Sequence, residues 1–297
     1  MFKLDNKLGL GLAALGRPGY INLGHHQSIG EDKSKEAMKN QCHSVLDHAY
    51  NKGIRYFDVA RVYGESEEFL SSWIRKQNQF SGFVGSKWGY EYLADWNVET
   101  DQHERKDHSH PFLKKQWVET RMNLGKSIDL YQIHSWQESI PMEDTFSKLL
   151  ELKEKGYFKY LGVSNFSAKQ IEKMNKFSGN QIISSQPHFS ILFRHSEKEI
   201  IPQSHSLGIG SIVYSPIARG LLSGKYKSGH IFNEDDARHN HHTFEDEHLE
   251  KGLRIYNILL EWTKDKGFNP TQLAIAWTLY TDGVTSAICG SKNPEQA

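Results

Sequence analysis

Residues 160–186, YLGVSNFSAKQIEKMNKFSGNQIISSQ, indicate how this chain folds. The stretch begins with an apolar run at Tyr160–Val163 and ends with another at Ile182–Gln186, and both are predicted to be strands. Between them, Ser167 is followed three residues later by Gln170, a capping-box pattern that predicts the start of a helix. A strand, a helix and a second strand in this order predict parallel strands joined by a helical crossover.

The same alternation continues on both sides of this stretch. A helix is expected over residues 37–52 and another near 195–207, and Asn269-Pro270 is expected to start a third. Further strands are expected at Tyr56–Ala60, Phe83–Lys87, Ile128–His134, Ser211–Tyr214 and Thr285–Cys289. The fold is therefore predicted to be α/β with a parallel sheet.

Two topologies fit this alternation, a doubly wound open sheet and a closed (β/α)8 TIM barrel. Gly9, Gly11 and Gly16 superficially resemble the glycine-rich turn of an open dinucleotide-binding sheet. No helical periodicity follows them until about residue 36, so we discount that interpretation. The chain has the length of one barrel and shows no internal repeat or linker, and we expect residues 1–297 to form a single barrel domain.

Composition argues against several classes of protein. Lys plus Arg and Asp plus Glu both number 36, and the resulting zero formal net charge argues against nucleic-acid binding. No apolar run reaches about 18 residues, the length that a membrane-spanning helix needs. Only Cys42 and Cys289 are present, which is too few to cross-link a chain of this size and favours a reducing, cytoplasmic setting.

Polar residues suited to chemistry stand at the carboxyl end of one predicted strand after another. They are Asp58, Lys87, His134, Ser164-Asn165, Gln186 and Tyr214-Ser215, with Ser291-Lys292 after the final strand. One buried residue of this kind is usually a paired core residue. A parallel barrel, however, gathers the carboxyl ends of all its strands on one face, where its active site lies. The recurrence predicts an active site there, and the polar segments 88–110 and 229–248 are expected to be loops on the same face.

The motifs around these residues resemble those of the aldo-keto reductase superfamily. Its catalytic motifs are similar to Phe57-Asp58-Val59-Ala60 with Tyr63-Gly64, to Ser86-Lys87-Trp88-Gly89 and to Gln132-Ile133-His134. Its cofactor-binding signatures resemble GVSNF at 162–166, YSP at 214–216, GLLSGKY at 220–226 and GSKNPEQ at 290–296. The motifs occur in order over nearly the whole chain. The resemblance implies an enzyme that uses NADPH (or forms it from NADP⁺ in the reverse direction) to interconvert a small carbonyl compound and its alcohol.

The resemblance also implies four catalytic roles. Tyr63 is expected to protonate the carbonyl oxygen as hydride reaches the carbon. A free tyrosine has a pKa near 10 and is a poor acid at neutral pH, so the positive charge of Lys87 is expected to favour loss of its proton. Asp58 is expected to hold Lys87 charged and aimed at Tyr63, and His134 to donate a hydrogen bond to the carbonyl oxygen.

By the same resemblance, the remaining signature residues are expected to bind the cofactor. Ser164, Asn165 and Gln186 are expected to contact the nicotinamide carboxamide, and Tyr214 to stack on the nicotinamide ring. The loop that wraps the pyrophosphate is expected to include Ser215, Ile217, Gly220, Leu222 and Lys225. Ser291 and Lys292 are expected to recognise the 2′-phosphate, with Gln296 in the same signature. A lysine offers phosphate a point charge where an arginine would bind it bidentately, so NADPH is favoured over NADH without excluding NADH.

The chain departs from the family pattern at its last residues. Asn293-Pro294-Glu295-Gln296 has the form of a helix start, with a cap residue and a proline at the first helical position. Relatives continue from this point with the eighth barrel helix, whereas only Ala297 follows here. The barrel is therefore expected to be truncated at the start of its last helix.

Two groups of residues have both a functional and a structural interpretation. His239, His241, His242 and His248 cluster in a polar loop, but their spacing fits no common zinc site and no metal is expected. Trp88, Tyr90 and Trp136 follow catalytic strands, where they would wall a pocket for flat carbonyl substrates or else pack in the core.

Two other functions stay open beside the reductase. A redox-sensing regulatory subunit, such as the potassium-channel β subunits that share this architecture, would bind NADPH and turn over slowly. A purely structural barrel would make the four polar strand ends a coincidence. The sequence assigns neither the substrate nor the oligomeric state.

Overall fold

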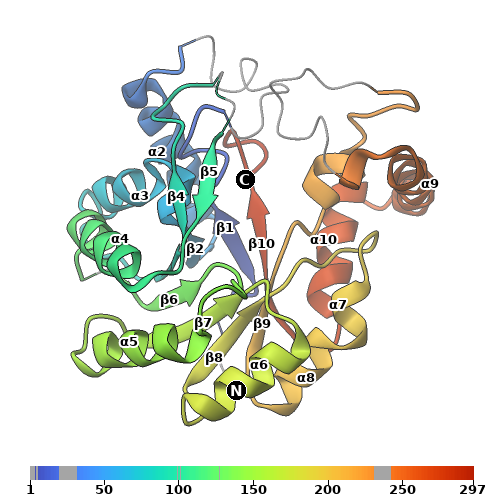
Figure 1. The fold of residues 1–297 in the computed structure, drawn as a ribbon. Coiled ribbons are helices and arrows are strands. Elements are labelled where there is room, and N and C mark those ends of the chain that lie inside the picture. The colour runs from blue at the N-terminus through green and yellow to red at the C-terminus, as the bar shows by residue number, and fades with distance from the viewer. Residues whose placement is uncertain are drawn as a thin grey trace.

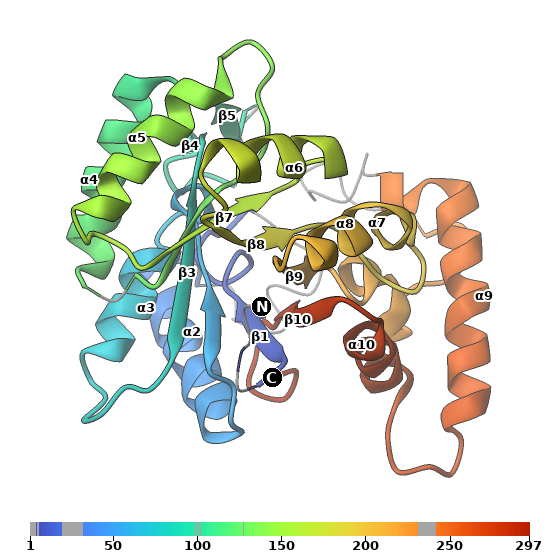
Figure 2. The ribbon, with the colours of Figure 1, turned by 90° about the horizontal axis from the view of Figure 1, so that it is seen from below.

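A computed structural model of the chain describes residues 4, 6–19, 32–98, 100, 102–126, 128–230 and 242–297. Eight parallel strands close into a barrel with helices around it (Figures 1 and 2). The strands are β1 (Leu8–Gly11), β2 (Tyr56–Asp58), β3 (Phe83–Trp88), β6 (Leu130–Ile133), β7 (Tyr160–Ser164), β8 (Ile182–Gln186), β9 (Gly210–Tyr214) and β10 (Val284–Gly290). β1 pairs with both β2 and β10, which completes the ring. The predicted barrel is therefore confirmed, and the open sheet is excluded.

The helices lie on the outside of the barrel, as crossover helices must. They are α2 (Lys35–Asn51), α3 (Ser66–Ile74), α4 (His110–Leu124), α5 (Met142–Glu154), α6 (Ala168–Phe177), α7 (His195–Lys198), α8 (Ile200–Ser206), α9 (Asp246–Thr263) and α10 (Pro270–Tyr280). The described residues also form the short 3-10 helices η1 (Arg61–Tyr63), η2 (Ala218–Ser223) and η3 (His242–Phe244). Figure 2 shows α9 and α10 on the side of the barrel opposite α4 and α5.

The predicted helix caps are present. At the start of α6, Ser167 Oγ accepts from the Gln170 backbone N–H at 3.3 Å, while Gln170 Oε1 accepts from the Ser167 N–H at 2.9 Å. Asn269 and Gln272 make the same reciprocal pair at the start of α10. After β10, the Gln296 N–H donates to Asn293 Oδ1 at 3.0 Å, so the predicted cap at Asn293 forms a turn.

The structure differs from the sequence analysis in three places. The strand β1 was missed, because LGLG is four residues long and its glycines hide any alternating pattern. Segment 88–110 is not a plain loop, since it contains the antiparallel hairpin of β4 (Tyr90–Tyr92) and β5 (Glu104–Lys106). The helix expected near 195–207 is divided at Glu199 into α7 and α8.

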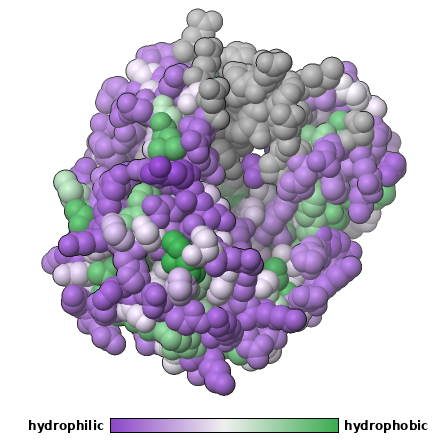
Figure 3. All heavy atoms as spheres, viewed as in Figure 1, coloured by the Kyte–Doolittle hydropathy of each residue, from purple (hydrophilic) through white to green (hydrophobic). Residues whose placement is uncertain are grey.

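The core has an outer and an inner part. The largest apolar cluster fills the space between the strands and helices such as α2, α3 and α4, and includes Phe57, Trp73 and Trp117. A smaller cluster lies inside the barrel, where Tyr56 meets Leu130, Ile212 and Ile288. The face shown in Figure 3 is mostly hydrophilic, with apolar residues in small scattered groups. None of the described helices combines the length and apolarity needed to cross a membrane.

Candidate active site

The structure brings the four predicted catalytic residues together at the carboxyl ends of neighbouring strands. Asp58 ends β2, Lys87 lies near the end of β3, and His134 follows β6. Tyr63 is the last residue of η1, which follows β2. Its phenolic oxygen lies 3.4 Å from Nε2 of His134, and Lys87 Nζ lies 4.8 Å from the centre of its ring. A phenol, a cation and an imidazole therefore converge on one point.

Lys87 and Asp58 form a buried ion pair beneath Tyr63. The exposed fractions of the two residues are 0% and 3%. Lys87 Nζ donates to Asp58 Oδ1 and, at 3.0 Å, to the carbonyl oxygen of Val59. Because a buried charge is costly unless it is paired and hydrogen-bonded, this arrangement holds the ammonium in its charged form at a fixed position.

Two further side chains hold the other oxygen of Asp58. Oδ2 accepts from the Tyr56 hydroxyl at 2.8 Å and from Gln186 Nε2 at 3.0 Å. Sequence reasoning missed Tyr56, although its position two residues before Asp58 on a strand puts both side chains on the same face. Gln186 was predicted to contact the cofactor, and in the structure its amide nitrogen is already bonded to Asp58.

Tyr56 fits inside the barrel because the strands on either side carry glycine. A Cβ atom at Gly9 would lie 2.5 Å from the Tyr56 ring, and one at Gly85 would lie 2.7 Å from its hydroxyl oxygen. Burial, and then the charge of Asp58, raise the pKa of Tyr56 well above its usual range. Tyr56 therefore keeps its proton and stays a hydrogen-bond donor to the carboxylate.

His134 is held in its neutral form. Burial lowers the pKa of His134 well below its usual range, and the charges of Lys87 and Arg17 lower it further. Its ring stands edge-on to the ring of Tyr63, at 84° with the centres 5.6 Å apart. A neutral imidazole carries one N–H, which can be donated to an oxygen placed beside Tyr63.

The position of Tyr63 depends on a close crossing of two chain segments. A Cβ at Gly16 would lie 2.2 Å from the carbonyl oxygen of Tyr63, and one at Gly64, where φ is +61°, would lie 2.4 Å from the carbonyl oxygen of Gly16. Arg17 is the residue after Gly16. Its Nη1 donates to the carbonyl oxygen of Val62 at 3.1 Å, and its guanidinium carbon lies 5.9 Å from the centre of the Tyr63 ring. Sequence reasoning did not identify Arg17 as part of the site.

The residues predicted to contact the nicotinamide lie beside this group. Asn165 Nδ2 donates to the carbonyl oxygen of His134 at 2.9 Å, and Asn165 Oδ1 accepts from the Tyr214 hydroxyl at 2.8 Å. Ser164 Oγ donates to the backbone carbonyl of Gln186 at 3.0 Å. His188 stacks on one face of the Tyr214 ring. The two ring centres are 5.1 Å apart and the ring planes are inclined by 11°. His188 was not predicted from the sequence.

The loop that follows β9 has an unusual backbone. Ser215, Ala218 and Arg219 have φ values of +57°, +49° and +54°, although none of them is glycine. Strain of this kind is typical of segments that hold a ligand. The other residues predicted to bind the pyrophosphate differ in exposure: Leu222 is buried in an apolar cluster, Ile217 and Gly220 are half-buried, and Lys225 is exposed.

Residues 291–296 form a closed turn at the end of β10. Ser291 Oγ donates to the carbonyl oxygen of Asn293 at 2.8 Å, which leaves its lone pairs but not its proton for a ligand. Gln296 Oε1 accepts from the Lys292 N–H at 2.9 Å, and Gln41 Nε2 on α2 donates to the Lys292 carbonyl at 2.8 Å. The backbone of Lys292 is thus held from both sides.

The three aromatic residues that had two interpretations differ in their contacts. Trp88 is fully buried in the core, and Trp136 packs edge-on against Phe166 at 5.2 Å. The Tyr90 ring contacts the ring of a predicted catalytic residue, His134, with the two centres 5.2 Å apart. His239 and His241 lie outside the described residues.

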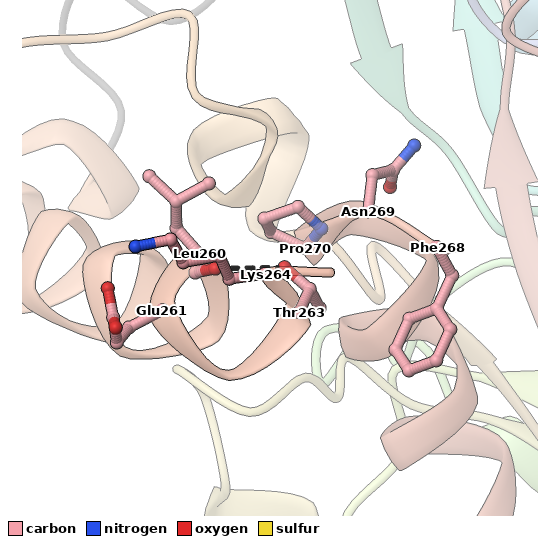
Figure 4. A pocket seen from close by; sticks show the side chains of 7 residues that line it. All are labelled: Leu260, Glu261, Thr263, Lys264, Phe268, Asn269 and Pro270. Atoms are coloured by element: carbon pink, nitrogen blue, oxygen red, sulfur yellow. Dashed lines mark hydrogen bonds between the residues drawn. The ribbon is translucent and has the colours of Figure 1, made fainter. Parts of the chain in front are cut away.

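The described residues near this site form no metal-ligand group, and a surface hollow of the protein lies away from it. Within the described ranges, no three His, Cys, Asp or Glu side chains are grouped so that they could hold a metal ion. A hollow lies where α9 ends and α10 begins (Figure 4). It is lined by Leu260, Glu261, Thr263, Lys264, Phe268, Asn269 and Pro270. None of the predicted site residues is among them.

Comparison with known proteins agrees with this geometry. The sequence model of the aldo/keto reductase family matches residues 7–297. A probable aldo-keto reductase of Glycine max is 32% identical over 80% of this chain and 66% of its own length. The putative aryl-alcohol dehydrogenase AAD16 of Saccharomyces cerevisiae is 30% identical over 82% of this chain and 76% of its own. The chain therefore spans about two thirds to three quarters of these relatives.

A solved structure shows the same fold. The glycerol dehydrogenase of Gluconobacter oxydans superposes with a TM-score of 0.81 at 25% identity, over 99% of this chain and 86% of that one. The family match and the relatives settle the identification that the barrel and its four converging side chains suggested. The chain belongs to the aldo/keto reductase family, whose members are oxidoreductase enzymes that use nicotinamide cofactors.

Proposed function

We propose that this protein reduces an aldehyde or ketone to an alcohol with NADPH, and catalyses the reverse oxidation. The observation that carries the proposal is the convergence of Tyr63, Lys87 and His134 at one point, with Asp58 buried behind them. When bound, the nicotinamide supplies the hydride that the carbonyl carbon receives. The remaining steps fall to the side chains of the chain.

A carbonyl oxygen placed between Tyr63 Oη and His134 Nε2 meets two donors. His134, held neutral, donates a hydrogen bond that polarises the carbonyl and orients it. As negative charge builds on that oxygen, Tyr63 transfers its proton to it and becomes a phenolate. The ammonium of Lys87 stabilises the phenolate, and Asp58 keeps that ammonium charged and in place.

The proposed cofactor site runs along the carboxyl ends of β7 to β10. Its support is the Tyr214 ring backed by His188, the strained loop after β9, and the closed turn that presents Lys292. We infer that Ser164 and Asn165 orient the carboxamide and that Lys292 contacts the 2′-phosphate. Both cysteines are free thiols, which supports placing the protein in a reducing compartment such as the cytoplasm.

The experiment that tests this function follows NADPH oxidation with a panel of aromatic and aliphatic aldehydes, for the wild type and Tyr63→Phe. We expect kcat to fall by about 10²–10⁴-fold in the variant because the proton donor is lost. NADPH binding, followed by fluorescence titration, is expected to stay within about twofold of the wild type, since Tyr63 acts on the carbonyl oxygen.

Two results contradict the proposal. Turnover that survives in Tyr63→Phe excludes Tyr63 as the acid. Tight NADPH binding by the wild type without turnover of any carbonyl favours the redox-sensing subunit instead.

A further inference from the structure

The β4–β5 hairpin stands beside the four catalytic residues. It leaves the end of β3 directly after Trp88, and Figure 1 shows it on the side of the barrel toward which the arrow of β10 points. In its antiparallel register Tyr90 is opposite Lys106 and Tyr92 is opposite Glu104. The hairpin therefore projects one aromatic and one cationic side chain from neighbouring positions.

Buried contacts fix the base of the hairpin. Gln116 on α4, which is 3% exposed, accepts from the Gly89 N–H at 2.9 Å and donates to the Tyr90 carbonyl at 2.7 Å. Gly89 has φ of +113°, and a Cβ there would lie 2.5 Å from the fully buried ring of His108. Only glycine fits this position, so the direction in which the hairpin leaves the barrel is determined by packing.

Tyr90 is a residue of the hairpin that contacts His134. Its ring meets the ring of His134 at 75° with the centres 5.2 Å apart, and its side chain is partly exposed. A carbonyl compound bound between Tyr63 and His134 therefore has the Tyr90 ring as a side wall. Such a wall favours a flat aromatic substituent, since aromatic pairs gain energy beyond the area that they bury.

The charged side chains near the Tyr90 ring differ in whether an opposite charge compensates them. Asp58 compensates Lys87, and Glu104 pairs with Arg17 at 3.1 Å. Lys106 lies over the Tyr90 ring at 5.6 Å and donates from Nζ to the Trp136 carbonyl at 3.1 Å. Within the described part of the chain no carboxylate forms an ion pair with Lys106, so its ammonium is available to an anion at the mouth of the site.

From this arrangement we propose that the β4–β5 hairpin is a substrate subsite that selects aromatic aldehydes carrying a carboxylate. The aldehyde lies between Tyr63 and His134, the aromatic ring lies against Tyr90, and the carboxylate is bound by Lys106. The inference rests on the proposed function for the position of the carbonyl group. Tyr90 and Lys106 determine specificity and take no part in the chemical step.

The test uses two unreactive carbonyl compounds, terephthalamate and terephthalamide, which have the same shape and differ by one negative charge. Calorimetry in the presence of NADP⁺ measures their binding to the wild type and to Lys106→Met. We expect the wild type to bind the carboxylate about fivefold more tightly than the amide, and Lys106→Met to lose that preference. The matched control is Arg105→Gln, since Arg105 neighbours Lys106 on β5 but pairs with Glu91 at 2.5 Å. The control should keep the preference.

Tyr90 is tested separately with aldehyde pairs. Tyr90→Leu is expected to lower the ratio of kcat/KM for benzaldehyde over a linear aldehyde by about fivefold, and Tyr90→Phe to restore it, because the ring is kept. Equal binding of the two terephthalic compounds by the wild type, or a preference that survives in Lys106→Met, overturns the subsite. Because that binding requires no turnover, a failure of the reductase activity itself is recognised independently.

Discussion

The hydroxyl of Tyr56 donates a 2.8 Å hydrogen bond to Oδ2 of Asp58, from a position two residues earlier on the same strand. The Tyr56 phenol lies inside the barrel and fixes, through this hydrogen bond, the carboxylate that holds Lys87. A residue that never meets the substrate thus helps to place the cation beside Tyr63.

Tyr56→Phe removes this donor and leaves Asp58 with one hydrogen-bond partner fewer. We expect a loss of about 1–3 kcal/mol in the free energy of unfolding, since a buried carboxylate is left less satisfied. The pH dependence of kcat/KM is also expected to move, which a purely structural residue would not cause. Tyr131→Phe is the control, because the equally buried Tyr131 hydroxyl forms no hydrogen bond with Asp58. If Tyr56→Phe and Tyr131→Phe lower the free energy of unfolding equally and leave the pH dependence of kcat/KM unchanged, Tyr56 does not position Asp58.

The Lys87–Asp58 pair is expected to show strong coupling in a double-mutant cycle. Asp58→Asn leaves a buried ammonium without its counter-charge and is expected to lower the free energy of unfolding by about 3–5 kcal/mol. In Lys87→Met with Asp58→Asn both charges are gone, and much of that loss should be recovered. Urea denaturation of the wild type, Asp58→Asn, Lys87→Met and the double variant measures the coupling. Additive effects would show that the two side chains do not stabilise each other.

Gly64 and Gly125 form a matched pair, because both have φ of +61°. A Cβ at Gly125 meets no atom within 4 Å, so Gly125→Ala should cost about 1–3 kcal/mol for the backbone conformation alone. Gly64→Ala adds a clash with the Gly16 carbonyl and should cost at least about 1 kcal/mol more and lower kcat. Thermal unfolding and NADPH oxidation measure the two effects. If both variants behave alike, the crossing of Gly16 and Gly64 does not position Tyr63.

The free energy of unfolding is expected to depend on His188 at acid pH. Burial, followed by the charge of Arg219 and the neighbouring His242, lowers the pKa of His188 to about 4 from its usual 6.5. The unfolded chain then binds a proton between pH 6.5 and about 4 that the folded chain does not. The stabilisation is complete above pH 6.5 and is lost as the pH falls toward 4. His188→Phe keeps a ring against Tyr214 and should flatten this decline, whereas a change at the exposed His195, such as His195→Gln, should not. An unchanged decline in His188→Phe would rule out the assignment.

Lys292 is expected to distinguish NADPH from NADH. Lys292→Met should weaken NADPH binding by about tenfold, since a charge-assisted contact to the 2′-phosphate is lost. NADH binding should change by less than about twofold, because NADH has no such phosphate. The exposed Lys227, changed to methionine, is the control in the same fluorescence titration. Equal weakening of both cofactors would place Lys292 away from the 2′-phosphate.

Much of the fold could be predicted because its signals are local. The apolar runs of seven strands and the reciprocal caps at Ser167 and Asn269 act within a few residues. The strand β1 could not be found this way, because its glycines are required by contacts distant in sequence: Gly9 packs against Tyr56 and Gly11 against Ile288. The hairpin was missed because its two strands are only three residues long and its direction depends on packing of Gly89 against His108.

The residues of the site also divide into those marked by local sequence signals and those whose position depends on contacts between distant residues. Asp58, Lys87 and His134 could be predicted because each carries suitable chemistry at a strand end, and Tyr63 because its motif resembles that of the family. Arg17 and His188 were not, because their importance comes from the rings of Tyr63 and Tyr214, which the fold brings to them. Gln186 shows what sequence reasoning could not predict. Its side chain was expected to contact the cofactor, and in the structure it donates a hydrogen bond to the carboxylate of Asp58.

The pairing of β1 with β10 has a consequence for how this protein reaches its native state. Leu8 lies opposite Ala287, so the two strands that close the ring are separated by almost the whole chain. Contacts at such separation carry the largest entropy of loop closure, and they form slowly. The strands from β2 to β9 can associate through contacts that are nearer in sequence, while ring closure waits for β10 to dock between β9 and β1. Hydrogen exchange during refolding should therefore show the amides of β1 among the last to become protected.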